Sequence, residues 1–164
     1  MEPRFTVHSR YNEQEAIRFN RALLFNVWHI KKTIIVSNIA LLFMIVTSLI
    51  AHNYMFAISL VFALAVFNWY FFMGVDLKAA RAYHKNKQIH DQEFVFCFHD
   101  DQYESTTDDG TTTSVPYSTL HMIIETPTNI YIMHAPTVGT IIQKGNCSAE
   151  FIKFIHEIKN RYKI

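Results

Sequence analysis

The stretch VTSLIAHNYMFAISL, residues 46–60, decides the fold of this chain. Two polar residues, His52 and Asn53, separate apolar runs of 19 and 22 residues, 33–51 and 54–75, in which no Asp, Glu, Lys or Arg occurs. As helices these runs would extend about 28 and 33 Å, close to the roughly 30 Å of a bilayer's hydrocarbon core. A soluble helix of this length would normally show a polar face, and neither run has one. The stretch therefore predicts a hairpin of two transmembrane helices with His52 and Asn53 at its tip.

Two alternatives fit these runs less well. A pair of buried helices in an unusually hydrophobic soluble protein would have a similar composition, but the length of both runs favours spans. A signal peptide also joins positive charge to an apolar run, yet that run has about 7–15 residues and leads to a cleavage site. Here the first run begins only after 32 residues, and a second follows at once. We therefore expect residues 1–32 to remain in the mature protein.

Lys and Arg residues flank the hairpin on one side only. Residues 1–32 carry six and residues 76–90 carry four, whereas the tip carries none. Because cytoplasmic flanks are enriched in these residues, both termini are predicted to be cytoplasmic, with the lipid bilayer as the first expected partner. Trp28 and the aromatic residues at 69–72 agree, since they stand at the ends of the spans, where amphipathic rings favour the interface.

Each span carries one asparagine that can meet the other. Asn38 and Asn68 lie 15 residues on either side of Asn53. In antiparallel helices they would lie at similar depth, where their amides could form a hydrogen bond worth about 0.6 kcal/mol. A bond within each helix or to a neighbouring subunit is the alternative, and the sequence leaves this open.

Elements outside the hairpin can be predicted from hydrophobic periodicity. Residues 5–10 alternate as a strand does. Residues 12–30 are predicted to form an amphipathic helix with Asn12 as N-cap and Glu15 in the capping-box position. This helix should run along the membrane surface and continue into the first span. After the spans, residues 76–90 should form a helical connector.

From residue 91 the hydrophobic period changes to two. Residues 93–98 have apolar side chains on both faces and should form a buried strand. The turn sequence Asp108-Asp109-Gly110 predicts a hairpin between the next two strands, and three further strands precede a C-terminal amphipathic helix. The sequence does not decide whether strand 5–10 joins this sheet. The predicted core consists of Phe94, Phe96, Phe98, Ile123, Ile130, Ile132, Phe151, Ile155 and Ile158.

Three stretches resemble the C-terminal domain of the bacterial YcxB-like proteins: SVPYSTLHMIIETPTNIYIM (114–133), IIQK (141–144) and EFIKFIHEIK (150–159). Two positions depart from the commoner pattern, Tyr117 in place of Trp and Gln143 in place of Pro. The resemblance implies an α+β membrane protein of the bacterial cytoplasmic (inner) membrane, with a two-helix transmembrane hairpin and a small pleckstrin-homology-like β-roll or barrel capped by a C-terminal helix. It implies no established activity. The motif positions that match are Val115, Pro116, Tyr117, Ser118, Leu120, Ile124, Glu125 and Thr126.

The chain is accordingly divided into four parts. A strand and juxtamembrane helix (1–32) precede the transmembrane hairpin (33–75). A helical connector (76–90) then leads to a cytoplasmic YcxB-like β-rich domain with a C-terminal helix (91–164).

Nothing in the sequence predicts an enzyme, a metal site or a bound cofactor. The chain has nine His, but it has no H-E-x-x-H, C-x-x-C or Gly-rich phosphate loop, and His84 and His90 lie six residues apart. Cys97 and Cys147 belong to a domain placed in the reducing cytoplasm, so no disulfide is expected. The acidic turns lack the alternating ligands of a calcium loop.

Charge divides the chain into an acidic part and basic parts. Residues 91–125 contain eight Asp and Glu and no Lys or Arg, whereas residues 1–32, 76–90 and 144–164 each carry a net charge of +3. The acidic part should point away from an anionic bilayer and bind no nucleic acid. A solvated face that only keeps the domain soluble is the alternative to a binding role. The candidate binding residues for a basic protein partner are Asp100, Asp101, Asp108 and Asp109.

Two classes of function remain. The first is a membrane-anchored cytoplasmic module that binds or regulates a protein or another copy of the chain; an immunity protein against a membrane-acting toxin is one specific form. The second is a subunit of an oligomeric transport or channel-type complex. Two spans enclose no path alone, and the absence of charged residues in the spans weakens this second class.

Overall fold

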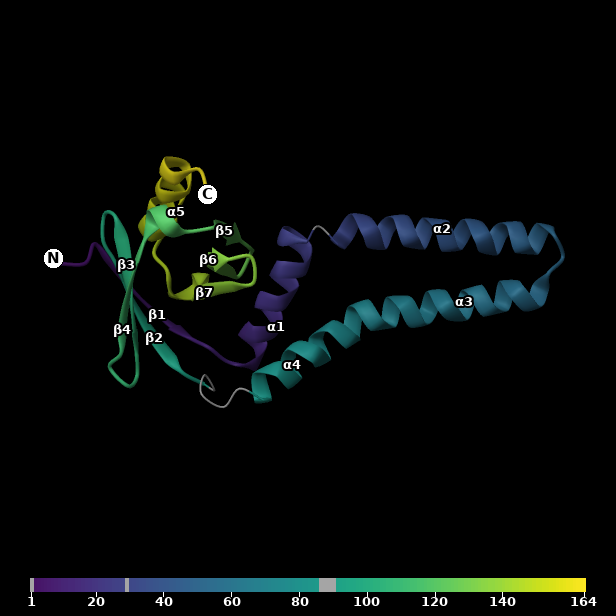
Figure 1. Cartoon of the computed structure of the whole chain (residues 1–164), viewed down its shortest axis with the longest axis horizontal. Helices are drawn as coiled ribbons and strands as arrows, with labels where there is room; N and C mark the ends of the chain where they lie inside the picture. Colours follow the sequence, from purple (N-terminus) through teal and green to yellow (C-terminus); the bar gives the residue numbers. More distant parts are fainter. Residues whose placement is uncertain (1, 29, 86–90) are drawn as a thin grey trace.

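The computed structural model describes residues 2–28, 30–85 and 91–164 of the 164-residue chain. A head of two antiparallel sheets and a C-terminal helix carries a long helical hairpin, and both chain termini lie at the head (Figure 1). The predicted α+β class with two long apolar helices is confirmed.

The hairpin consists of α2 (Ile30–Ile50) and a second helix of 32 residues, Tyr54–Lys85. The second helix comprises α3 (Tyr54–Trp69), a π-helical turn (Tyr70–Gly74) and α4 (Val75–Lys85). Asn53 caps α3, because its Oδ1 accepts a hydrogen bond from Phe56 N (3.3 Å). Both helices are long and apolar enough to cross a membrane, and few of their residues are buried, which argues against a soluble core pair. Residues 86–90 of the predicted connector lie outside the described residues.

The first sheet has the order β1-β2-β3-β4 and contains the N-terminal strand. β1 (Phe5–Arg10) pairs antiparallel with β2 (Glu93–Phe98) along its whole length. β3 (Gln102–Thr107) and β4 (Thr112–Pro116) follow through the predicted turn, where Gly110 adopts a φ of 82° that favours glycine. Residues 2–28 and 91–164 therefore build one folded head, and the hairpin is inserted between two neighbouring strands of it.

The second sheet contains β5 (Met122–Glu125), β6 (Asn129–Ala135) and β7 (Val138–Gln143) in sequential order. Within residues 2–28, 30–85 and 91–164 no backbone ladder joins the two sheets. The structure therefore contains no closed barrel in this part of the chain, and the prediction of a barrel is wrong in that respect. The chain leaves β4 at Pro116 through a short 3₁₀ turn (Tyr117–Thr119). Because proline lacks the N–H that a ladder needs, pairing ends there.

The main core lies between the sheets and α5 (Ala149–Tyr162), whose N-cap Ser148 accepts from Phe151 N (3.1 Å). Eight of the nine predicted core residues are buried in it, and Phe94 packs against it half-buried. The prediction for this core is confirmed because strand and helix periods fix which face turns inward.

A second core lies on the outer face of the second sheet, under α1 (Glu13–Ala22). Leu23 packs there with Tyr131 and Met133, and Phe19 joins from the edge. α1 does not continue directly into α2, because the π-helical turn Leu23–Val27 and a bend at Trp28 follow it (Figure 1). Its apolar face covers a sheet. Its course along the membrane surface stays a prediction.

Candidate functional site

The space between the two sheets is filled at one end and open at the other. At the filled end the Phe151 ring of α5 meets the Phe98 ring, with 4.8 Å between their centroids. At the open end, beyond Phe96, lies a cleft with a volume of about 540 Å³. Clefts of this size commonly hold ligands or partner side chains. The lining consists of Ser9, Tyr11, Phe19, Phe94, Phe96, Ser105 and residues 137–141.

The cleft has an aromatic floor and hydroxyl groups beside it. Phe94 and Phe96 stack with nearly parallel rings, 6.0 Å between centroids and 5° between planes. Ser9 is the β1 partner of Phe94, and Ser105 is the β3 partner of Phe96. None of the described lining residues is Asp, Glu, Lys, Arg or His. The cleft therefore suits an uncharged, mainly apolar group with a polar edge, because a buried ion would lack a counter-charge here.

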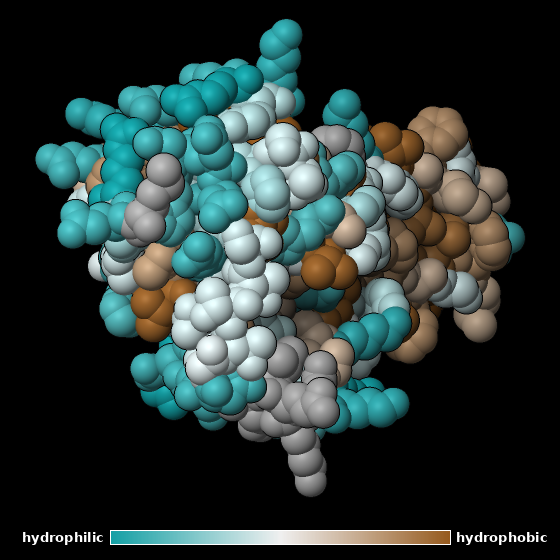
Figure 2. All heavy atoms as spheres, turned by 60° about the vertical axis from the view of Figure 1, so that its left-hand side comes forward, coloured by the Kyte–Doolittle hydropathy of each residue, from teal (hydrophilic) through white to brown (hydrophobic). Residues whose placement is uncertain are grey.

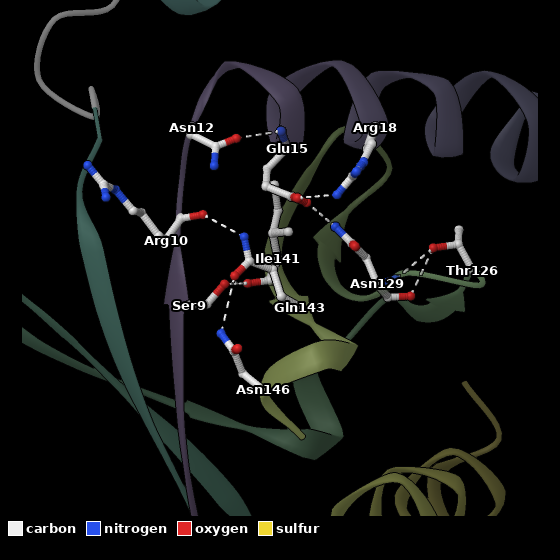
Figure 3. A network of polar contacts seen from close by, with 10 residues as sticks. All are labelled: Ser9, Arg10, Asn12, Glu15, Arg18, Thr126, Asn129, Ile141, Gln143 and Asn146. Carbon is white, nitrogen blue, oxygen red and sulfur yellow. Dashed lines mark hydrogen bonds and ion pairs between the residues drawn. The ribbon is translucent and has the colours of Figure 1, made fainter. Parts of the chain in front are cut away.

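Side chains join the two sheets beside the cleft, where the edges of β1 and β7 face each other (Figure 3). Such side-chain bridges hold two edges further apart than the ~4.8 Å spacing of a backbone ladder, which leaves the cleft open. Each bridge donates to a backbone oxygen of the opposite edge: Ser9 Oγ to Ile141 (2.8 Å), Gln143 Nε2 to Arg10 (3.1 Å) and Asn146 Nδ2 to His8 (2.8 Å).

A neutral polar cluster adjoins the cleft through Thr140. Tyr103 Oη lies 2.9 Å from His134 Nε2 and 2.8 Å from Thr140 Oγ1. Burial raises the pKa of Tyr103 to about 12 and lowers the pKa of His134 below its ordinary 6.5. Both groups are therefore uncharged at neutral pH. Sequence reasoning missed this cluster, since its members lie on three strands with no motif around them.

A buried carboxylate attaches α1 to the second sheet (Figure 3). Glu15 is 3% exposed and accepts hydrogen bonds from Asn129 Nδ2 and, at 2.6 Å, from Arg18 Nη1. Thr126 Oγ1 accepts from Asn129 N (3.0 Å) and donates to Asn129 O (3.0 Å). The capping-box prediction is half right: Asn12 Oδ1 accepts from Glu15 N (3.0 Å), but the Glu15 carboxylate turns inward. The Glu15 carboxylate thus binds Asn129 of the second sheet and does not take part in the helix cap.

Polar contacts hold the other side of α1 against the base of the hairpin. Arg21 binds Asp76 of α4 through both Nε (2.8 Å) and Nη2. Glu13 Oε2 lies 3.2 Å from His84 Nε2. The two helices run antiparallel, because Glu13 precedes Arg21 in α1 whereas its partner His84 follows Asp76 in α4. α1 therefore contacts both the head and the hairpin.

The four predicted binding aspartates lie in two different turns. Asp100 and Asp101 lie in the β2–β3 turn and Asp108 and Asp109 in the β3–β4 turn, so the six residues of β3 separate them. At ~3.3 Å per residue this separation is roughly 20 Å. The two pairs lie at opposite ends of the strand that they share, and their role in binding stays a prediction.

Three of these aspartates also have local partners. Asp100 Oδ1 accepts from Arg4 Nη1 (3.4 Å), and Asp108 Oδ2 accepts from Glu93 N (3.1 Å). Asp109 accepts from Thr107 Oγ1 and Thr111 N, and these bonds lower the pKa of its carboxyl. The Asp109 bonds lie within their own turn, whereas those of Asp100 and Asp108 connect the turns to Arg4 and to the start of β2.

The structure does bring Asn38 and Asn68 together. Asn68 Nδ2 donates to Asn38 Oδ1 (2.9 Å), and Asn38 Nδ2 donates to Asn68 Oδ1 (3.2 Å). Asn68 Nδ2 also lies 2.9 Å from Leu64 O, so a bond across the helices and a bond within one helix coexist. The pair satisfies its own polar groups within the hairpin.

No metal centre is found in the part of the chain that the structure describes: no three His, Cys, Asp or Glu side chains are grouped to hold an ion. Cys97 and Cys147 are free thiols. Burial raises the pKa of Cys147 to about 11, so this thiol is protonated and unreactive at neutral pH. His90 lies outside the described residues.

Comparison with known proteins identifies one family. No curated protein and no solved structure matched the chain. The family model described as YcxB-like protein matches residues 98–155, which run from the end of β2 into α5. The resemblance found in the sequence is therefore confirmed, and residues 98–155 of this chain are similar to the YcxB-like protein family.

Proposed function

We propose that this chain is a membrane-anchored cytoplasmic module that binds a partner protein by taking one uncharged, mainly apolar side chain into the cleft between its sheets. The observation that carries the proposal is the cleft itself, with about 540 Å³ of space over the stacked rings of Phe94 and Phe96 and no charged lining residue. Aromatic pockets of this kind anchor the residues that dominate binding energy in protein interfaces.

The setting of the cleft supports an anchored module. Four strands followed by three, with a C-terminal helix between the sheets, agree with a pleckstrin-homology-like head. The Lys and Arg flanks favour a head on the cytoplasmic side of a bacterial inner membrane. Figure 2 agrees with a head in water and a hairpin in the membrane, since the head in front is largely hydrophilic and the hairpin behind it is hydrophobic.

The acidic turns have a lesser part in this proposal. They can raise the association rate with a basic partner over a distance of about a Debye length. No observation favours the transport alternative, because the polar pair within the hairpin, Asn38 and Asn68, is occupied by mutual hydrogen bonds.

Photocrosslinking of the full chain in membranes tests the proposal. Val138 lines the cleft and is 58% exposed, so benzoylphenylalanine at position 138 should crosslink to a protein of defined mass. Ser105→Phe fills the cleft and should reduce this product at least tenfold. Thr106→Phe is the matched control, since it adds the same ring on the neighbouring residue, whose hydroxyl meets Thr112 Oγ1 (3.1 Å) outside the cleft. An equal yield from both variants would reject the cleft as the binding site.

A further inference from the structure

A second hollow, of about 310 Å³, lies where the head meets the beginning of the first span. α1 and the π-helical turn after it form one side, the first turn of α2 closes it, and the β5–β6 turn forms the opposite side. Three cationic side chains line it, Arg18 and Arg21 from α1 and Lys31 from α2. They are separated in the sequence but reach one hollow because the chain turns between α1 and α2.

Carboxylates outside the lining hold both guanidinium groups in place. Glu15 accepts one hydrogen bond from Arg18, and Asp76 accepts two from Arg21. A guanidinium has five N–H donors in a planar fork, so each arginine retains donors beyond those its carboxylate takes. An arginine that is already oriented loses less conformational entropy when it binds an oxyanion.

Among the described lining residues of the hollow, three are cationic and one is acidic. Its one acidic lining residue, Glu125, is engaged by Lys144 Nζ at 2.5 Å and by His156 Nε2 at 2.8 Å, and these bonds lower the pKa of its carboxyl. Lys31 Nζ lies 5.3 Å from the centre of the Phe25 ring, an arrangement that leaves an ammonium its hydrogen-bonding capacity. The amide of Asn26 and the hydroxyl of Thr128 add uncharged donors.

When the hairpin spans a bilayer, the hollow lies at the level of the lipid headgroups. Trp28, 55% exposed, follows the π-helical turn of the hollow, and Trp69, 57% exposed, stands at the corresponding end of α3. Exposed tryptophans at the ends of spans lie at the membrane interface. The geometry points to a binding site for the phosphate of an anionic phospholipid headgroup, held by Arg18, Arg21 and Lys31. This inference rests on the membrane placement proposed above, but not on the partner cleft.

Fluorescence quenching in vesicles tests the site in the full chain. The protein has two tryptophans, so Trp69→Phe leaves Trp28 as the only reporter beside the hollow. The variant is reconstituted in phosphatidylcholine vesicles that contain phosphatidylglycerol, with bromine on the acyl chains of one lipid or the other. At equal mole fraction, brominated phosphatidylglycerol should quench Trp28 more strongly than brominated phosphatidylcholine.

Adjacent lysines provide the matched variants. Lys32→Gln removes one cation outside the hollow and should lower the preference for phosphatidylglycerol no more than about fivefold, the effect of one charge near an anionic surface. Lys31→Gln removes the same charge and also a hydrogen bond to the phosphate, so it should lower the preference several times further. Equal losses in the two variants, or no preference in the parent, would overturn the site.

Two controls separate the sources of a failure. Inorganic phosphate at constant ionic strength should not remove the preference; if it does, the hollow takes a free oxyanion and the lipid assignment is wrong. Quenching of Trp28 by brominated phosphatidylcholine reports only that the protein is inserted in the bilayer. If neither brominated lipid quenches Trp28, the membrane placement is refuted rather than the site.

Discussion

Replacing Glu15 by alanine should strongly destabilise the head. Asn129 is 1% exposed, so its Nδ2 group would lose its carboxylate acceptor where water cannot replace it. An unsatisfied buried donor costs about 1–3 kcal/mol, and each lost methylene adds about 0.8 kcal/mol. The Arg18 side chain is 46% exposed, so its ion pair contributes less than about 1 kcal/mol. We expect a loss of about 3 kcal/mol, or roughly 10–20 °C in the unfolding temperature of the head.

Glu15→Gln is the control, because glutamine retains the methylenes and one oxygen acceptor for Asn129. It should cost about 1 kcal/mol, the difference between a charged and a neutral hydrogen bond. Thermal unfolding of the full chain in detergent micelles can be followed by the near-ultraviolet circular dichroism of the buried tyrosines, Tyr103, Tyr117 and Tyr131. If both variants unfold at the same temperature, the Glu15–Asn129 bond does not stabilise the head and the reasoning fails.

Three further predictions concern the core, the hairpin and pH. Phe98 is fully buried, so Phe98→Ala should cost about 3–5 kcal/mol in the same unfolding assay, and an unchanged midpoint would contradict the core assignment. A double-mutant cycle of Asn38→Leu and Asn68→Leu should give a coupling of about 0.6 kcal/mol in hairpin stability, and strict additivity would contradict their mutual bond. Burial lowers the pKa of His134, so the unfolded head binds its proton more readily and stability should fall as pH drops through 6.5. His134→Gln should reduce the dependence of the free energy of unfolding on pH between pH 8 and 5. If the slope of stability against pH is unchanged in this variant, a group other than His134 takes up the proton.

Local sequence patterns were sufficient to predict the two long apolar helices, the strands and the main core. The apolar runs, the alternation around Phe96 and the helical stripe of α5 each depend on residues close in sequence. The distance between the two acidic turns also follows from local sequence, because the six residues of β3 separate Asp101 from Asp108.

Most contacts between distant residues could not be predicted from the sequence; the Asn38–Asn68 pair is an exception, because the two residues lie equally far from the hairpin tip. Glu15 and Asn129 lie 114 residues apart, and no pattern in a single sequence pairs them. One signal was present, since Glu15 lies four residues before Phe19 and therefore on the same face of the predicted helix. A carboxylate beside the apolar stripe of a helix indicates a buried polar partner, because a charged group is rarely buried alone. The cleft depends on how two sheets diverge, which strand periodicity does not encode.

The insertion of the hairpin between β1 and β2 sets an order of events during synthesis. β1 leaves the ribosome first, and its partner strand follows only after both spans have been made. Until then its edge has no β2 to pair with, and such edges are prone to join other chains. The first sheet can therefore be completed only after both helices of the hairpin have been synthesised. The open edge of β1 stays exposed for as long as the ribosome takes to make residues 11–98.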